Sequence, residues 1–487
     1  MKNIFFLIFL ISIIGCKKEL RIQRPYTVAL LGTLDNPLDP VLRSDVNART
    51  LLNQVCGRLV LINEELALKP YMADSWTISN DNLSYEFLIS NNFKFSDGTP
   101  VEAKDVKFSI ERMQSISDSY AASLTRNIIE VSVPQNNHLR IRLQTPNVRF
   151  LYLLAHPRFC VLSQSKPFVK LGEMSVPNSF GDLAFESWDN EKQTLILKKK
   201  AKDQLIQVKY LDQKSALSAF NRGEIDDLSF YLLNENEVSG LKNDKKVIST
   251  KYYWTWIFEI NAKSQIGRDN ENRKILLHNF NQEKFVSDWG VEVVPGQSVI
   301  PAGVYGSEGT QVLLKKNTNV EFCKKPFSIG IIKGVPNESK LERAIKNSFE
   351  TAVGCAPKID WYSMSSFTDE VAKAKDTLYF SAISNRMVDP IEYYRSFISS
   401  NSENLLNCSS KEMDKIFGEL DQKPLHSRAI SDYLKLHKAF LKAACGIPVG
   451  YPIFKFVYSS RVNNPINNPI GMDLNFWATN SKLEVGL

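Results

Sequence analysis

The sequence contains no apolar run long enough to cross a membrane as a helix. Its longest nearly apolar stretch, residues 4–14, has 11 residues, whereas a spanning helix needs about 20. A strong excess of one charge is also missing, because 60 basic and 53 acidic residues leave a net charge of +7 over 487 residues. Nucleic-acid-binding proteins usually concentrate basic residues on one face. We therefore expect neither a polytopic membrane protein nor a nucleic-acid binder.

Motifs of the common enzyme classes are missing as well. The chain has no P-loop, no G-x-G-x-x-G and no G-x-S-x-G motif. No two cysteines stand in a C-x-x-C pair, and the five histidines form no H-x-x-x-H motif, so no zinc-site pattern is present. These absences predict a protein that is not an enzyme and that needs no cofactor or metal.

The N-terminus has the features of an export signal. Met1, Lys2 and Asn3 make a short positive start, and the apolar stretch that follows ends in Ile-Ile-Gly-Cys at Cys16. This ending resembles the lipobox of bacterial lipoproteins, in which the cysteine is lipidated and becomes the mature N-terminus. The resemblance predicts a signal peptide over 1–15, lipid on Cys16 and a tether over 16–24. An uncleaved signal anchor, or cleavage elsewhere, is the alternative.

Six further cysteines remain once Cys16 is assigned to lipid. An even number in an exported chain is compatible with disulfides, although buried free cysteines are also common. Six cysteines allow 15 complete pairings, and the sequence does not choose among them. The six are Cys56, Cys160, Cys323, Cys355, Cys408 and Cys445.

Strand and helix signals alternate along the chain. Residues 327–361 read as strand, helix and strand, an order that indicates a parallel α/β sheet. The expected strands are 26–31, 84–89, 225–230, 252–260, 327–332 and 358–361, and the expected helices are 45–61, 102–113, 215–222, 273–285 and 339–353.

Residues 66–112 carry a family resemblance. They read LALKPYMADSWTISNDNLSYEFLISNNFKFSDGTPVEAKDVKFSIER. This run resembles the bacterial extracellular solute-binding proteins of family 5, which serve peptide, dipeptide and nickel ABC importers. Its members carry a similar P-x-L-A-E-S-W piece, then T-Y-T-F-x-L and F-x-D-G-T-P-V. Similar motifs follow the family order elsewhere, among them LDP at 38–40, AFNRGEID at 219–226 and IPAGVYG at 300–306.

The resemblance implies an α/β, periplasmic-binding-protein-like fold, with two α/β lobes, a hinge and an inserted third subdomain. We expect lobe one over 25–255 with the insert at 51–164, lobe two over 256–457 and a return to lobe one over 458–487. The implied function is a monomeric, lipid-anchored protein of the cell envelope, on the periplasmic or extracellular face of a membrane. It would capture a peptide or similar small polar ligand and deliver it to an ABC permease. A sensory or adaptor lipoprotein of the same fold is the alternative.

One position departs from the peptide-binding relatives. They carry an Asp, three residues before an acidic-Pro pair, that pairs with the ligand's α-amino group. Aligned on Asp389-Pro390, this position is Arg386, and an arginine favours a carboxylate or phosphate over an ammonium group. Two alternatives remain open, namely a shifted loop in which Asp389 holds the amine, and an Arg386 that points to solvent.

Two tryptophans complete the site hypothesis. Trp254 and Trp256 alternate along one expected strand, so both should point to the same face. That face is either a stacking wall of the ligand cleft or part of the core. The remaining candidate ligand contacts are Leu34, Asp35, Ser384 and Asn385.

Overall fold

The computed structural model describes most of the chain from residue 24 onward. The described ranges are 24–34, 38–42, 46–62, 67–116, 120–147, 149–200, 204–229, 231, 233–251, 254–310, 326–363, 366–384, 389–401, 403–423 and 427–462. The predicted lipidation site Cys16 lies outside them, as do the candidate ligand contacts Asp35, Asn385 and Arg386. Within these ranges, no helix is both long enough and apolar enough to cross a bilayer.

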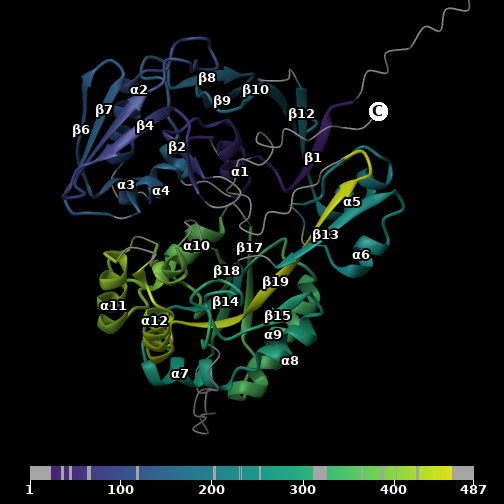
Figure 1. Cartoon of the computed structure of the whole chain (residues 1–487). Helices are drawn as coiled ribbons and strands as arrows, with labels where there is room; N and C mark the ends of the chain where they lie inside the picture. The colour runs from purple at the N-terminus through teal and green to yellow at the C-terminus, as the bar shows by residue number, and fades with distance from the viewer. Residues whose placement is uncertain are drawn as a thin grey trace, which may run out of the picture.

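A four-stranded sheet forms the centre of lobe one (Figure 1). Its strands, in spatial order, are β1 (Tyr26–Leu31), β12 (Gln204–Leu211), β11 (Thr194–Lys199) and β10 (Leu183–Asp189). β1 runs parallel to β12, and the other two pairs are antiparallel. One buried cluster joins this sheet to α1 (Val46–Val55), and another joins it to α5 (Gln213–Asn221) and α6 (Glu235–Ser239).

The inserted subdomain has its own sheet and its own core. The sheet order is β4 (Ala73–Ile78), β5 (Ser84–Ile89), β7 (His138–Leu143) and β6 (Ile128–Gln135). Burial alternates along β5 and β7, so one face of the sheet packs on the core that α2 (Ala103–Ser115) covers. The smaller elements are α3 (Tyr120–Thr125), α4 (Phe150–Leu154), the 3-10 helix η1 (Pro157–Phe159), and the pairs β2 (Val60–Ile62) with β3 (Leu68–Pro70) and β8 (Phe168–Leu171) with β9 (Met174–Pro177).

Lobe two is built on a seven-stranded sheet, and the predicted strand–helix–strand unit is confirmed there. β16 (Ser328–Ile332) and β17 (Lys358–Tyr362) are parallel, with α9 (Glu338–Val353) between them in sequence. The other strands are β13 (Lys245–Lys251), β14 (Trp254–Ile260), β15 (Val293–Pro295), β18 (Leu378–Ser384) and β19 (Gly446–Ser459). The helices are α7 (Asn270–Asn279), α8 (Gln282–Trp289), α10 (Phe367–Lys373), the 3-10 helix η3 (Pro390–Phe397), α11 (Lys411–Asp421) and α12 (Ile430–Ala443).

Strand β19 connects the lobes. Its first residues pair with β14 and β15, and residues 453–459 pair with β13, beside α5 and α6 of lobe one (Figure 1). Near the crossing, the buried ammonium group of Lys455 forms ion pairs with Glu235 of α6 and Glu292 before β15. The lobes are therefore joined by a continuous strand with a charged contact at its midpoint. The lobe boundaries expected at 255/256 and 457/458 stay predictions.

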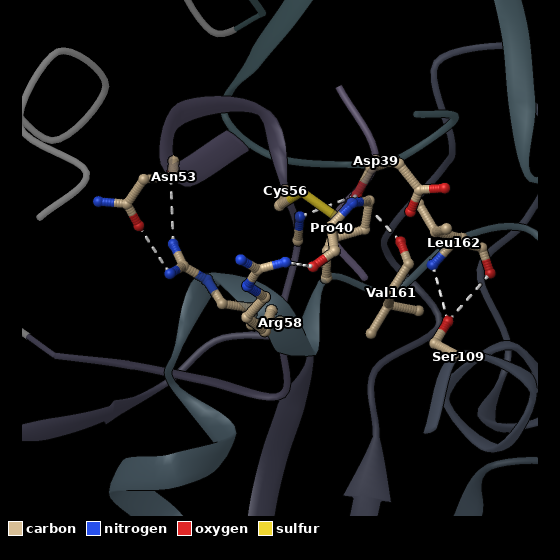
Figure 2. The surroundings of a disulfide bond; sticks show 12 residues. Asp39, Pro40, Asn53, Cys56, Arg58, Ser109, Val161 and Leu162 are labelled. Atoms are coloured by element: carbon tan, nitrogen blue, oxygen red, sulfur yellow. Dashed lines mark hydrogen bonds between the residues drawn. A yellow bond between two sulfur atoms is a disulfide. The ribbon is translucent and has the colours of Figure 1, made fainter. Parts of the chain in front are cut away.

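Two disulfides lie within the described residues. Cys56, after α1, bonds to Cys160, and Figure 2 shows this bond near Arg58 and Asn53. Cys408 bonds to Cys445 at the start of β19. Cys355 is disulfide-bonded too. For these cysteines, the free-thiol alternative is therefore wrong.

Most predicted elements are confirmed to within a residue or two, but three are wrong. The helix expected over 45–61 ends at Val55 and is followed by Cys56, which is disulfide-bonded, and by Gly57, where an added Cβ would lie 2.2 Å from the ring of Phe180. The helix expected over 273–285 is two helices, because the side chain of Asn281 caps the start of α8. The described part of 225–230 carries only isolated bridges at Asp227.

Candidate ligand-binding site

A cavity of about 420 Å³ lies between lobe two and the parts of the chain that precede it. On the side that precedes lobe two, the wall includes Arg49 of α1 and Arg158 of η1. On the lobe-two side, it includes Glu259 of β14 and Arg395 of η3. This volume lies within the range of small-molecule sites. Because both walls contribute side chains, movement of one lobe against the other would change the shape of the cavity.

The cavity wall carries charges of both signs. Its basic residues are Arg49, Arg158 and Arg395, and its acidic residues are Glu259, Glu392 and Glu403. Apolar side chains such as Phe367 and Phe397 fill part of the remaining wall. Such a lining suits a small polar ligand with charged groups more than an apolar one.

Glu259 is the acid that reaches the cavity from the central sheet. Burial raises the pKa of Glu259, the hydroxyl of Ser381 lowers it by donating a hydrogen bond, and the negative charge of Glu403 raises it further. The net direction is upward, so the ionised form of Glu259 is under-stabilised. A cationic ligand group beside this carboxylate would supply the missing stabilisation.

Arg395 is held at the cavity by Glu392. Its Nε and one Nη each lie 2.5 Å from a different oxygen of the Glu392 carboxylate. Burial opposes the negative charge of Glu392, but Arg395 and Arg149 outweigh that effect and lower the pKa of Glu392 to about 2. The acid is therefore ionised at neutral pH, and it fixes the guanidinium group of Arg395 at the wall.

Asp389, which the sequence offered as an alternative partner for a ligand amine, is already engaged. Its two carboxylate oxygens accept from Arg149 at 2.8 Å and from Arg428 at 2.6 Å, and one of them also caps η3 at the amide of Ile391. Asp389 is also buried. A ligand amine would have to compete with two guanidinium groups for this carboxylate.

The predicted tryptophans lie away from the cavity wall. Trp256 is 5% exposed, with its ring stacked on Phe380 and edge-on to Trp289. Trp254 is half-buried and packs edge-on against Phe454. The core interpretation accounts for both rings, and a ligand contact by either one stays a prediction.

The other predicted contacts divide between wall and core. Ser384, at the end of β18, lines the cavity. Leu34 is buried in the core of lobe one. The structure therefore brings Ser384 alone of the described candidates to the cavity wall, and ligand contact by any of them stays a prediction.

The charged wall residues were not predicted from the sequence. Glu259 had a usable signal, because it is the one charged residue in the otherwise apolar run WTWIFEI. Arg49, Arg158 and Arg395 had none, since they belong to no motif and lie far apart in the sequence.

Comparison with known proteins decides the family. The model of the bacterial extracellular solute-binding proteins, family 5, matches residues 67–404. The chain belongs to this family. The resemblance drawn from residues 66–112 is thereby confirmed.

Relatives of this family 5 member cover nearly its whole length. The probable D,D-dipeptide-binding periplasmic protein DdpA of Escherichia coli is 22% identical over 488 residues, which is 92% of each chain. The periplasmic binding protein DppA of Helicobacter pylori, solved with the peptide STSA, matches with a TM-score of 0.79 and 17% identity over 95% of this chain and 98% of that one. NikZ of Campylobacter jejuni, solved with Ni(L-His), gives a TM-score of 0.76 and 19% identity over 93% and 99%. These likenesses confirm the predicted two-lobed fold.

Proposed function

We propose that this family 5 member is a lipid-anchored solute-binding protein that captures a small peptide or peptide-like ligand between its lobes and delivers it to an ABC importer. The observation that carries the proposal is the cavity of about 420 Å³, which is lined from both sides and whose wall as a whole carries charges of both signs. A peptide with free termini carries one positive and one negative end, so it complements such a wall. The ligands named for DdpA and for the Helicobacter protein belong to this class.

Within this proposal, Glu259 receives the ligand's ammonium group. Its carboxylate lies at the cavity wall, and among the described residues its hydrogen-bond partner is the neutral hydroxyl of Ser381. The ligand's carboxylate then faces the basic side chains, for which Arg395 and Arg158 are the candidates.

The test is isothermal titration calorimetry with Ala-Ala and Ala-Ala-Ala, each with a free and with an acetylated N-terminus. Wild type should prefer the free amine, and Glu259→Gln should weaken binding of the free amine about tenfold while leaving the acetylated peptide unaffected. Glu86→Gln is the matched control, because Glu86 pairs with Arg140 on the exposed surface of the inserted subdomain. If wild type binds the free and the acetylated peptides equally well, Glu259 does not bind the ligand's ammonium group.

Ala-Ala-Ala with a free C-terminal carboxylate and Ala-Ala-Ala with a C-terminal amide test the prediction for Arg386. If this arginine faces the cleft, Arg386→Asp should weaken binding of a free C-terminal carboxylate more than binding of an amide. Equal effects on both peptides would place the Arg386 side chain outside the ligand contacts.

The delivery step needs a test in cells. A strain that lacks the protein should lose uptake of a labelled peptide that the purified protein binds. Unchanged uptake, together with an altered response to the peptide, would favour the sensory alternative. Native mass spectrometry of the purified protein would identify a co-purifying solute, and a solute without peptide-like chemistry would overturn the ligand class.

A further inference from the structure

A buried arginine of the inserted subdomain reaches into lobe two. Arg149 immediately precedes α4, and its side chain is 9% exposed. One Nη lies 2.8 Å from Asp389 and 2.6 Å from Glu392, and the other Nη pairs with Asp421. The three acids come from the residue before η3, from η3 itself and from the end of α11. One guanidinium group thus joins two segments of lobe two, η3 with its N-cap residue and the end of α11, to the insert.

The contact continues to the cavity wall. Glu392 bonds to Arg149 on one side and to Arg395 on the other, and both Glu392 and Arg395 line the cavity. Asp389 is shared in the same way between Arg149 and Arg428. Arg149 therefore holds the acid that orients a cavity arginine.

The charges in this cluster depend on Arg149. Two of its carboxylates, Asp389 and Glu392, have side chains that are 3% and 5% exposed. Buried carboxylates without enough positive partners are strongly unfavourable, whereas the same groups are well solvated once water reaches them. The ion pairs of Arg149 therefore stabilise the contact between the insert and lobe two, and this stabilisation is lost when the two separate.

We propose that Arg149 is a latch, a positioning residue that keeps the insert and lobe two together over the filled cavity and, through Glu392, keeps Arg395 aimed at the bound solute. Its main effect is on the rate at which solute leaves. The inference rests on the proposed solute-binding function, but the latch itself is a contact between lobes and can be measured without a solute.

The first test is small-angle X-ray scattering of the purified full chain. Arg149→Gln should increase the radius of gyration relative to wild type, and Arg149→Lys, which keeps the positive charge, should restore part of the compaction. Arg140→Gln is the control, because Arg140 pairs with Glu86 on the surface of the same subdomain. A scattering curve for Arg149→Gln that superimposes on the wild-type curve overturns the latch.

The second test measures release, with trialanine as the probe. Stopped-flow tryptophan fluorescence should show dissociation from Arg149→Gln about tenfold faster than from wild type, with an unchanged association rate. A merely structural arginine would lower the unfolding temperature without changing the dissociation rate, and that result overturns the proposal. If wild type binds no peptide, the proposed function fails, and the scattering experiment alone decides on the latch.

Discussion

His437 is a buried histidine whose ionisation should limit the stability of lobe two in mild acid. It lies on α12, fully buried, with its Nδ1 3.1 Å from the hydroxyl of Tyr394. Burial lowers the pKa of His437 to about 4, and the contact with the backbone of Thr310 only partly opposes this effect. The folded pKa lies below the unfolded value, so the unfolded chain binds the proton more readily. The contribution of neutral His437 to the free energy of unfolding is fully present above about pH 6.5, and it is lost as the pH falls toward 4.

The expected loss from this one group is about 3 kcal/mol of unfolding free energy between pH 7 and pH 4. Urea denaturation of wild type and of His437→Gln at pH 7, 5.5 and 4 measures it, and the variant should show a smaller drop. His138→Gln, at an exposed position on β7, is the control and should keep the wild-type slope. Equal slopes for wild type and His437→Gln would mean that other groups control the acid sensitivity.

At the residue scale, the sequence predicted chemistry where residues stand in a motif and missed it where they meet only in space. Ser384 was named from its segment of the family alignment, and it lines the cavity. Arg149 and Glu392 are 243 residues apart, so no spacing rule could join them. Trp256 shows the opposite case, because an aromatic ring in a strand suits a cleft wall and a core equally well, and only packing places it beside Phe380.

At the scale of elements, the Cys408–Cys445 disulfide has a functional position. It joins the segment before α11 to the start of β19, and both cysteines lie at the cavity wall. We expect the double variant Cys408→Ala/Cys445→Ala to lose about 3–4 kcal/mol of stability, from the loop-closure entropy of the chain between the cysteines. Peptide affinity should fall as well, because the wall loses a constraint.

The Cys56–Cys160 disulfide supplies the comparison for this prediction. It closes a longer loop, with a sequence separation of 104 against 37, and neither cysteine lines the cavity. Cys56→Ala/Cys160→Ala should therefore lower the unfolding temperature at least as much but leave peptide affinity unchanged. Calorimetry and thermal unfolding of both variants separate the two effects, and equal losses of affinity would contradict the assignment.

The elements that the sequence predicted well are those with a strong apolar period and a clear end signal. The residues of α9 repeat their apolar positions over four turns, and Gly354 ends the helix in a left-handed conformation. The element boundaries that were predicted wrongly depend on single side chains, which leave no periodic pattern in the sequence. The boundary between α7 and α8 depends on one capping asparagine, and the absence of a strand at 225–229 reflects Asp226 and Asp227, which hold Arg24 and Tyr26 through their buried carboxylates.

At the scale of the whole molecule, the predicted lipid anchor would fix lobe one close to a membrane. Arg24 forms a bidentate pair with Asp226, at 2.6 and 2.7 Å, so the chain is secured to lobe one at residue 24. Only eight residue steps separate Arg24 from Cys16, a reach of at most about 29 Å. Lobe one would then stay near the surface while lobe two moves.

Membrane fractionation tests the anchor. Cys16→Ser should move the protein from the membrane fraction to the soluble fraction or block its processing, and the wild-type chain should incorporate labelled palmitate. Lys17→Ala is the control and should remain with the membranes. A Cys16→Ser variant that fractionates and migrates like wild type would leave the protein without this anchor.

The course of β19 has a consequence for biosynthesis. This strand lies between β13 and β14 in the seven-stranded sheet, yet it is the last strand of the described chain to leave the ribosome. Until it emerges, β13 lacks its sheet partner and β14 has an open edge, so the seven-stranded sheet cannot be completed. If the predicted signal peptide directs export, this order favours an unfolded chain during translocation, because the seven-stranded sheet is completed only after residues 446–459 have been made.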